Sequence, residues 1–331
     1  MSDAWNREKI LELSAAFCRS RILLTAAELD LFGKLSKTPR TVGDLCNAEG
    51  WNPRGLTILL DALAAIGLVS KSLDRWYGLE SHLADLLTEE GNDSLLPMLL
   101  HRVHLWESWS HLTEIVKTGK APGQAETSTR SDEEINAFIE AMEVVARFMA
   151  DTIVDSIDLT RYQRLLDVGG GPGTYTMAFL RRAPHMTATL FDLPRVTEIA
   201  RKHLTEEGLI HRVQIVEGDY TADELPAGHD LALLSAIIHS NSRQGNLDLY
   251  KKIFRSLNPG GSILIRDFLM DPTHTRPVEG AIFAVNMLAA TEGGTTYTFE
   301  ETKQDLETAG FSDVRLIHDG ERMDQLVLAV K

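Results

Sequence analysis

The chain has 331 residues, of which 44% are hydrophobic and 24% charged, and its net charge is −15. This is the composition of a folded protein long enough for two domains, and its negative charge disfavours nucleic acid or an anionic membrane as a partner. Two cysteines, Cys18 and Cys46, a charged N-terminus and no apolar run of 18 residues lead us to expect a cytoplasmic protein without disulfides or a membrane span.

The N-terminal part is expected to form a winged helix. Apolar residues recur at helical spacing over residues 10–35, and this helix is expected to end near Gly33. Thr41 and Asp44 have the spacing of a capping box, and residues 52–69 form a further helix before the turn-rich stretch SKSLDRWYGLE. A helix, a turn, a second helix and a two-stranded wing either bind DNA or pack against another domain.

The composition of the winged helix favours dimerisation over DNA binding. Residues 41–78 carry three basic and four acidic side chains, and the helix over 52–69 offers a single arginine. Reading a major groove requires polar side chains for the base edges and cations for the phosphates. We therefore expect residues 1–95 to be a dimerisation domain of a homodimer. The alternative is a DNA-binding regulator that senses a cofactor.

Residues 96–150 are expected to be a helical connector that lines the substrate pocket, with a loop at 119–134. Its stretch HRVHLWESWSH holds three histidines, His101, His104 and His111, beside two tryptophans. His101 and His104 are one helical turn apart, but no third metal ligand with a known spacing appears, so we expect no metal. Trp106 is the residue of this helix expected to contact an aromatic substrate.

From residue 151 onward, short β-rich runs alternate with helices. The runs are RLLDVG (164–169), TATLFDL (187–193), VQIVEGD (213–219), DLALLSAII (230–238), SILIRDF (262–268), VRLIHD (314–319) and QLVLAV (325–330). Helices expected between the first six runs imply βαβ crossovers and a mostly parallel sheet. The link GERMD before the last run is too short for a crossover, so the last strand is expected to run antiparallel.

The glycine-rich turn after the first strand, DVGGGPG (167–173), is the candidate ligand site. Ligands of open α/β sheets lie beyond the carboxyl ends of the strands, and glycine lets the backbone approach them closely. Asp192, at the end of the second strand, can accept hydrogen bonds from a ribose. Thr174 or Thr176 stands where a dinucleotide fingerprint has its last glycine, and Pro172 lacks an N–H. S-adenosylmethionine has no phosphate, so it tolerates both departures.

Four motifs together resemble the S-adenosylmethionine-dependent O-methyltransferases of the caffeate and acetylserotonin type and their bacterial relatives. They are DVGGGPG (167–173), FDLPRV (191–196), EGDY (217–220) and NPGGSILIRD (258–267). The resemblance covers nearly the whole chain. It implies an N-terminal all-α winged-helix dimerisation domain and a Rossmann-like class I methyltransferase domain over residues 151–331, with S-adenosylmethionine as the cofactor.

The resemblance also assigns the residues that would bind the cofactor. The glycines of the loop would bend around its methionine part, Asp192 would hold the ribose, Asp219 would accept from the adenine amino group and Tyr220 would pack on the adenine face. The three glycines are Gly169, Gly171 and Gly173. Ser235 stands where the family commonly has a lysine that contacts the cofactor.

The family's general base is a histidine after the fourth strand, in a motif close to H-D-W-x-D. In the segment IIHSNSRQGN, His239 occupies that position, while Ser240 and Asn241 replace the acid and the tryptophan. Asp267 matches the first of two acids that flank the base, and Thr296 stands where the second belongs. The resemblance thus implies O-methylation of a hydroxyl on a small aromatic molecule, with His239 as base and Asp267 orienting it.

Several candidate residues keep two interpretations at this stage. Met287 matches a methionine that clamps the aromatic acceptor, and Asn286 could add a polar contact, but the segment 281–288 also reads as a buried helix. Arg266 and Arg243 either serve the substrate or form a salt bridge. The replaced acids leave open an N- or C-methyltransferase, or a relative that binds the cofactor for other chemistry.

Overall fold

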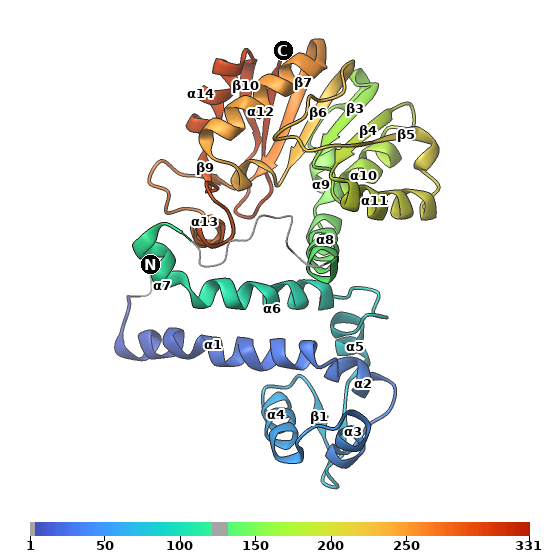
Figure 1. The fold of residues 1–331 in the computed structure, drawn as a ribbon, viewed down its shortest axis with the longest axis vertical. Helices are drawn as coiled ribbons and strands as arrows, with labels where there is room; N and C mark the ends of the chain where they lie inside the picture. Colours follow the sequence, from blue (N-terminus) through green and yellow to red (C-terminus); the bar gives the residue numbers. More distant parts are fainter. Residues whose placement is uncertain (1–3, 121–131) are drawn as a thin grey trace. The chain divides into compact units, whose positions relative to one another are not determined.

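The computed structural model describes residues 4–120 and 132–331, which fold as two compact units (Figure 1). One unit consists of the described parts of residues 1–107 and 132–144, and the other of those of 108–131 and 145–331. Most of the loop expected at 119–134 lies outside the described residues. The domain limits expected at residues 95 and 150 stay a prediction.

The first unit is mainly helical. Its helices are α1 (Arg7–Glu28), α2 (Leu31–Ser36), α3 (Val42–Glu49), α4 (Pro53–Ala65), α5 (Ser81–Leu87) and most of α6 (Leu96–Ser110) and α8 (Asp132–Arg147). Two short strands, β1 (Ser70–Lys71) and β2 (Tyr77–Gly78), pair antiparallel after α4. The helix–turn–helix of α3 and α4 and the predicted wing are therefore present.

Local capping chemistry decides where these helices begin and end. The Thr41 hydroxyl accepts the N–H of Asp44, whose carboxylate accepts the N–H of Thr41, so the predicted capping box is confirmed. The expected end near Gly33 is wrong, because the first helix already ends at Glu28. Asp30 then has a φ of 50°, and α2 continues through Gly33. A Cβ at Gly33 would lie 2.2 Å from Oδ1 of Asp30, so a larger residue there would displace the exposed side chain of Asp30.

The second unit is built on a largely parallel sheet. Within the described residues, seven strands follow the order β10-β11-β7-β6-β3-β4-β5. They are β3 (Arg164–Val168), β4 (Thr187–Asp192), β5 (Val213–Glu217), β6 (His229–Ser235), β7 (Leu257–Asp267), β10 (Ser312–His318) and β11 (Gln325–Val330). The strands β3 to β7 run parallel, and β11 is antiparallel to both neighbours, as predicted. A separate short parallel pair joins β8 (Leu269–Met270) and β9 (Tyr297–Thr298).

Helices cover both faces of this sheet (Figure 1). The face that carries Leu264 packs against α9 (Ala150–Asp155) and α10 (Thr174–Arg182), and the face that carries Ile265 packs against α12 (Arg243–Ser256) and α14 (Phe299–Ala309). Successive strand residues alternate between these faces. The remaining helices are α7 (Leu112–Thr118), α11 (Pro194–Glu206), α13 (Val278–Ala290) and the 3₁₀ turns η2 (Leu159–Arg161), η3 (Ile210–Arg212) and η4 (Ile238–Ser240). No helix among the described residues combines the length and apolar character needed to cross a membrane.

One expected crossover helix is absent. Residues 218–228, between β5 and β6, contain no helix, so this part of the prediction was wrong. The Asp219 carboxylate accepts the N–H of Thr221 at 2.8 Å and closes a turn instead. The Lys252 ammonium holds the segment by donating to the backbone carbonyls of Tyr220, Thr221 and Asp223. The segment therefore remains at the carboxyl end of β5.

Candidate functional site

The loop between β3 and α10 bends through three glycines with positive φ. Gly169, Gly171 and Gly173 have φ values of 68°, 57° and 85°, which side-chain-bearing residues rarely adopt. A Cβ at Gly169 would lie 2.4 Å from Cδ1 of Ile237, whereas a Cβ at Gly171 would meet no atom within 4 Å. The backbone of Gly171 therefore borders open space and can be approached closely.

Asp192 ends β4 beside this loop. Its Oδ2 accepts the N–H of Gly171 at 2.8 Å, and its Oδ1 accepts the N–H of Leu193 at 2.7 Å. Burial raises the pKa of this carboxyl, although both hydrogen bonds favour the ionised form. Each oxygen retains a lone pair beyond these bonds, which is what the acceptor of two ribose hydroxyls requires.

Asp219 and Tyr220 follow β5 at the same edge of the sheet. One carboxylate oxygen of Asp219 accepts the N–H and the hydroxyl of Thr221, and the other is bonded to none of the described residues. Burial raises the pKa of Tyr220 to about 12, and its hydroxyl lies 3.4 Å from Oδ1 of Asn241. A free acceptor beside a phenol ring suits a flat base that carries an amino group.

Asp167, at the end of β3, is buried beneath the glycine loop. The Thr176 hydroxyl donates to its Oδ2 at 2.6 Å. Burial and, to a smaller extent, the nearby Asp192 carboxylate nevertheless raise the pKa of Asp167 to about 6. The carboxyl therefore ionises near neutrality at a cost to the folded state.

His239 and Asp267 form a buried pair at the ends of β6 and β7. Nδ1 of His239 lies 2.8 and 2.9 Å from the two carboxylate oxygens of Asp267. Because an ionised carboxylate only accepts, we place the imidazole proton on Nδ1, which leaves a lone pair on Nε2. The N–H of Phe268 donates to Oδ1 of Asp267 at 2.8 Å and fixes the carboxylate in turn.

The backbone that carries His239 is strained and closely packed. Directly after β6, Ala236 has a φ of 57°, which costs a non-glycine residue about 1–2 kcal/mol. The turn η4 with His239 follows, and a Cβ at Gly294 would lie 2.4 Å from the carbonyl oxygen of His239. Strain of this kind is retained mainly where a side chain must be held in a particular place.

Ser240 and Asn241 take the place of the acid and the tryptophan that the family motif has after the base. Asn241 donates to the side chain of Asn246 at 3.0 Å, and Asn246 donates to the carbonyl of Ile238 at 2.8 Å. The Tyr297 hydroxyl donates to the carbonyl of Asn241 at 2.6 Å. Thr296, in the position of the family's second acid, is buried. These neutral contacts hold the turn that carries the histidine.

Aromatic side chains lie beside His239. Phe283 of α13 meets the imidazole edge-on, with 4.8 Å between ring centroids and an interplanar angle of 88°. Phe268 lies 5.4 Å from Phe283, and Met287, one turn further along α13, is buried. Sequence reasoning singled out Met287 but not the two phenylalanines. Phe283 could have been found from its spacing of four residues, which places it on the same side of the helix.

Asn286 accepts a hydrogen bond from Nε1 of Trp109 at 2.9 Å. Sequence analysis selected Trp106 from the same stretch, whereas Trp109 is the tryptophan that contacts a predicted substrate residue. Trp106 belongs to the first unit, where its ring centroid lies 5.6 Å from the guanidinium of Arg21. A role of Trp106 in substrate binding stays a prediction.

The two arginines left open by the sequence differ in their partners. Arg243 is paired with Asp305, since its Nε lies 3.1 and 3.0 Å from the two carboxylate oxygens. Arg266 instead donates from Nη1 to the hydroxyl of Ser235 at 3.3 Å. Arg243 thus joins α12 to α14, and Ser235 contacts a buried cation.

The histidine-rich stretch shows no metal chemistry in the part of the chain that is described. His101 packs edge-on against Phe138, with ring centroids 5.3 Å apart. Within residues 4–120 and 132–331, no group of three or more His, Cys, Asp or Glu side chains is arranged to hold a metal ion.

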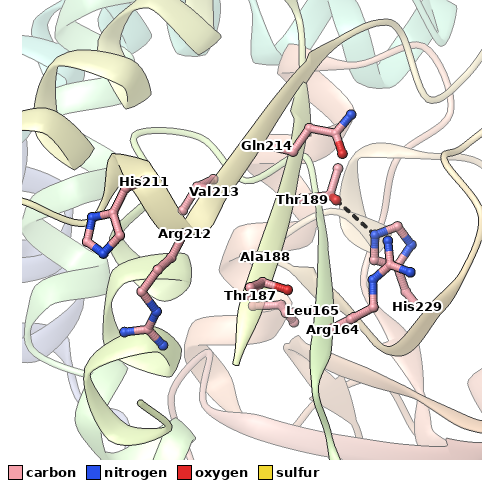
Figure 2. Close-up of a pocket in the computed structure, with 10 residues that line it drawn as sticks. All are labelled: Arg164, Leu165, Thr187, Ala188, Thr189, His211, Arg212, Val213, Gln214 and His229. Atoms are coloured by element: carbon pink, nitrogen blue, oxygen red, sulfur yellow. Dashed lines mark hydrogen bonds between the residues drawn. The ribbon is translucent and has the colours of Figure 1, made fainter. Parts of the chain in front are cut away.

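A hollow of about 330 Å³ lies at the opposite edge of the sheet, at the amino ends of β3 to β6 (Figure 2). His229 bonds to the Thr189 hydroxyl at 2.9 Å, the dashed line in Figure 2. Arg212 donates to the backbone carbonyls of Leu180, Ala183 and Met186. These groups serve the fold, and ligands of such sheets bind at the carboxyl ends, so this hollow is not the candidate site.

Comparisons with known proteins match both units. A family described as an O-methyltransferase domain matches residues 109–312, and one described as an O-methyltransferase dimerisation domain matches residues 11–92. The tetracenomycin polyketide synthesis 8-O-methyl transferase TcmO of Streptomyces glaucescens is 31% identical over 312 residues, which is 92% of this chain and 91% of that protein.

Two further similarities extend over nearly the full length. The 3-hydroxy-5-methyl-1-naphthoate 3-O-methyltransferase of Streptomyces sahachiroi is 28% identical and covers 93% of this chain and 90% of its own. The crystal structure of human N-acetylserotonin methyltransferase in complex with SAM has a TM-score of 0.86 at 25% identity, covering 100% of this chain and 99% of that one.

Because the Asp167 carboxyl is buried, we expect Asp167→Asn to gain stability relative to the wild type as pH rises. The folded wild type keeps this proton up to a pKa of about 6, while the unfolded chain loses it near 3.8. The stability of the wild type relative to the variant therefore falls as pH rises between these values. In total, the free energy of unfolding of the wild type falls by about 3 kcal/mol relative to that of the variant, and roughly half of this change occurs between pH 5 and 7.5.

Urea unfolding of the ligand-free proteins across this pH range measures the effect. Asp158→Asn is the control, because hydrogen bonds from Thr160 lower the pKa of the exposed Asp158, so that variant gains nothing as pH rises. A stability difference between the wild type and Asp167→Asn that stays constant with pH would contradict the account.

Proposed function

Since the chain belongs to the family of S-adenosylmethionine-dependent O-methyltransferases, we propose that it methylates the hydroxyl of a small aromatic molecule with His239 as general base. The expected fold class and cofactor agree with the family, and the family favours O-methylation over N- or C-methylation. The N-terminal match is to a dimerisation domain, not to a DNA-binding one. The observation that carries the proposal is the His239–Asp267 pair, which leaves Nε2 of the histidine able to accept a proton.

The residues at the carboxyl ends of β3, β4 and β5 fit the cofactor. We assign its methionine part to the glycine loop, its ribose to Asp192 and its adenine to Asp219 and Tyr220. The space beside Gly171 and the unused acceptor atoms of the two carboxylates support this assignment. When bound, S-adenosylmethionine supplies a methyl group that its sulfonium has already activated, so the protein mainly has to position the two reactants.

His239 and Asp267 would act on the proton of the acceptor. Nε2 takes the proton of the hydroxyl as the oxygen becomes a nucleophile, which contributes typically 10²–10⁴-fold to such reactions. Asp267 holds Nδ1–H and thereby fixes the reactive tautomer. Its carboxylate also stabilises the imidazolium that forms. A single carboxylate is sufficient for both tasks.

Three observations support an aromatic acceptor. Phe283 lies beside His239, Phe268 packs against Phe283, and buried Met287 adds a polarisable side chain on the helix of Phe283. The relative from Streptomyces sahachiroi is a 3-O-methyltransferase of a hydroxynaphthoate, which is an aromatic hydroxy acid. The phenylalanines would orient a flat ring and exclude water from the base.

Replacing the base tests the mechanism. His239→Gln should lower kcat about 10²–10⁴-fold, because no group then accepts the proton. The Kd for S-adenosylhomocysteine should stay the same, because His239 does not belong to the assigned cofactor contacts. Product formation is measured as the mass gain of one methyl group on an aromatic hydroxy compound that the wild type accepts.

His211→Gln is the matched control, since His211 lines the hollow at the opposite edge of the sheet, and it should keep full turnover. Full turnover of His239→Gln would remove the histidine from the mechanism and leave positioning alone as the source of catalysis.

The first unit supports a homodimer, which is part of the same proposal. The dimerisation-domain match begins at residue 11, and α1 exposes four large apolar side chains to between 56% and 64%: Ile10, Leu11, Leu13 and Phe17. A row of exposed apolar residues on one helix is typical of an interface. We propose that a second copy of the chain covers this helix.

A charge in this row should weaken the dimer. Phe17→Glu would bury an unpaired carboxylate in an apolar contact, so the variant should shift toward the monomer at micromolar concentration. Light scattering after size exclusion gives the mass. Val278→Glu changes an equally exposed apolar residue of the other unit and should leave the mass at that of a dimer. A dimer that is unaffected by Phe17→Glu would place the interface elsewhere.

A further inference from the structure

Arg266 is a buried cation with few partners among the described residues. Its side chain is 2% exposed at the end of β7. Nη1 donates to the Ser235 hydroxyl at 3.3 Å, Nη2 lies 3.6 Å from the sulfur of Met149, and Nε has no partner in the part of the chain that is described. None of the described carboxylates forms an ion pair with it. An unpaired buried charge is costly, and the natural compensation is an anion that arrives with a ligand.

Arg266 faces the helix that follows the glycine loop. It is next to Asp267 in β7, so the two side chains point to opposite faces of the sheet. Asp267 contacts His239 on the side of α12, while the guanidinium of Arg266 lies 5.5 Å from the ring centroid of Tyr175, the second residue of α10. Arg266 is therefore directed toward the glycine loop and away from the proposed base.

The strand order links this cation to one end of the cofactor. The residues assigned to adenine, ribose and the methionine part follow β5, β4 and β3 in turn, and the next strands are β6 and β7. Neighbouring strands are about 4.8 Å apart, so β6 lies roughly 10 Å from β4. The cofactor has one carboxylate, at the end of the molecule opposite the adenine. Ser235 and Arg266 are register partners at the ends of β6 and β7, where that end would arrive.

We propose that Arg266 binds the methionine carboxylate of S-adenosylmethionine and that Ser235 orients its guanidinium. The inference rests on the proposed placement of the cofactor along this edge of the sheet. A guanidinium binds a carboxylate through two parallel N–H donors, and the unpartnered Nε is one donor of such a fork. Asp167, on the same face of the sheet, supplies the opposite charge for the amino group of the same methionine end.

Calorimetric titration with S-adenosylmethionine and with decarboxylated S-adenosylmethionine tests this assignment, because the two compounds differ only in the carboxylate. The wild type should bind S-adenosylmethionine at least about 10-fold more tightly than the decarboxylated compound, as expected for a charge-assisted pair. Arg266→Met should lose this preference while its affinity for the decarboxylated compound stays. Arg266→Lys, which keeps the charge but not the fork, should retain a smaller preference.

Arg243→Met is the control, because that arginine is paired with Asp305, and the preference of this variant should equal that of the wild type.

A second measurement needs no ligand. Removing an unpaired buried cation should raise the thermal midpoint of ligand-free Arg266→Met, whereas loss of a structural arginine would lower it.

Four results would overturn the inference. Arg266 variants that keep the full preference for S-adenosylmethionine would show that the guanidinium binds another anion, such as a carboxylate of the acceptor. Variants that bind both compounds more weakly, by the same factor, would show that Arg266 has a structural role. A wild type that binds both compounds alike would contradict the carboxylate contact alone, whereas one that binds neither would also contradict the placement of the cofactor.

Discussion

Parallel pairing of β3 to β7 is the constraint on which the candidate site depends. Because the strands point the same way, their carboxyl ends meet at one edge, and residues far apart in the sequence become neighbours there. The glycine loop and Asp219 follow β3 and β5, and the strands β4, β6 and β7 end at Asp192, Ser235 and Asp267. A reversal of any of these strands would remove one group from the edge.

The alternation of side chains along the strands divides this edge into two chemistries. Asp267 faces α12, and its buried carboxylate holds the base His239 through a hydrogen bond from Nδ1. Its neighbour Arg266 faces α10 and has only neutral partners within residues 4–120 and 132–331. A paired buried charge holds a side chain in place, whereas an unpaired one leaves binding energy for a ligand. One two-residue segment thus serves both the proposed proton transfer and the proposed cofactor contact.

Much of this arrangement could be predicted from the sequence, because it depends on local patterns. Alternating β-rich runs predict the strands, the Thr41–Asp44 spacing predicts a cap, and the link before the last run predicts its direction. The glycines at 169, 171 and 173 do adopt positive φ. The resemblance to a family motif predicts the pair of His239 and Asp267, although the acid after His239 is replaced.

The remaining features depend on contacts that no local pattern encodes. Trp109 and Asn286 are 177 residues apart, so their hydrogen bond cannot be predicted from spacing. The helix expected between β5 and β6 gives way to a segment held by Lys252 from another helix. That Arg266 forms no ion pair with a described carboxylate is likewise a property of the packed structure.

The central claim is that S-adenosylmethionine lies along this edge, held by the glycine loop and Asp192. The most direct measurement is calorimetric titration of the wild type and Asp192→Ala with S-adenosylhomocysteine. The account predicts a wild type that binds and a folded variant whose Kd is at least about 10-fold higher, since hydrogen bonds to a charged group are lost. A folded wild type without binding, or equal affinity in the two proteins, would contradict it.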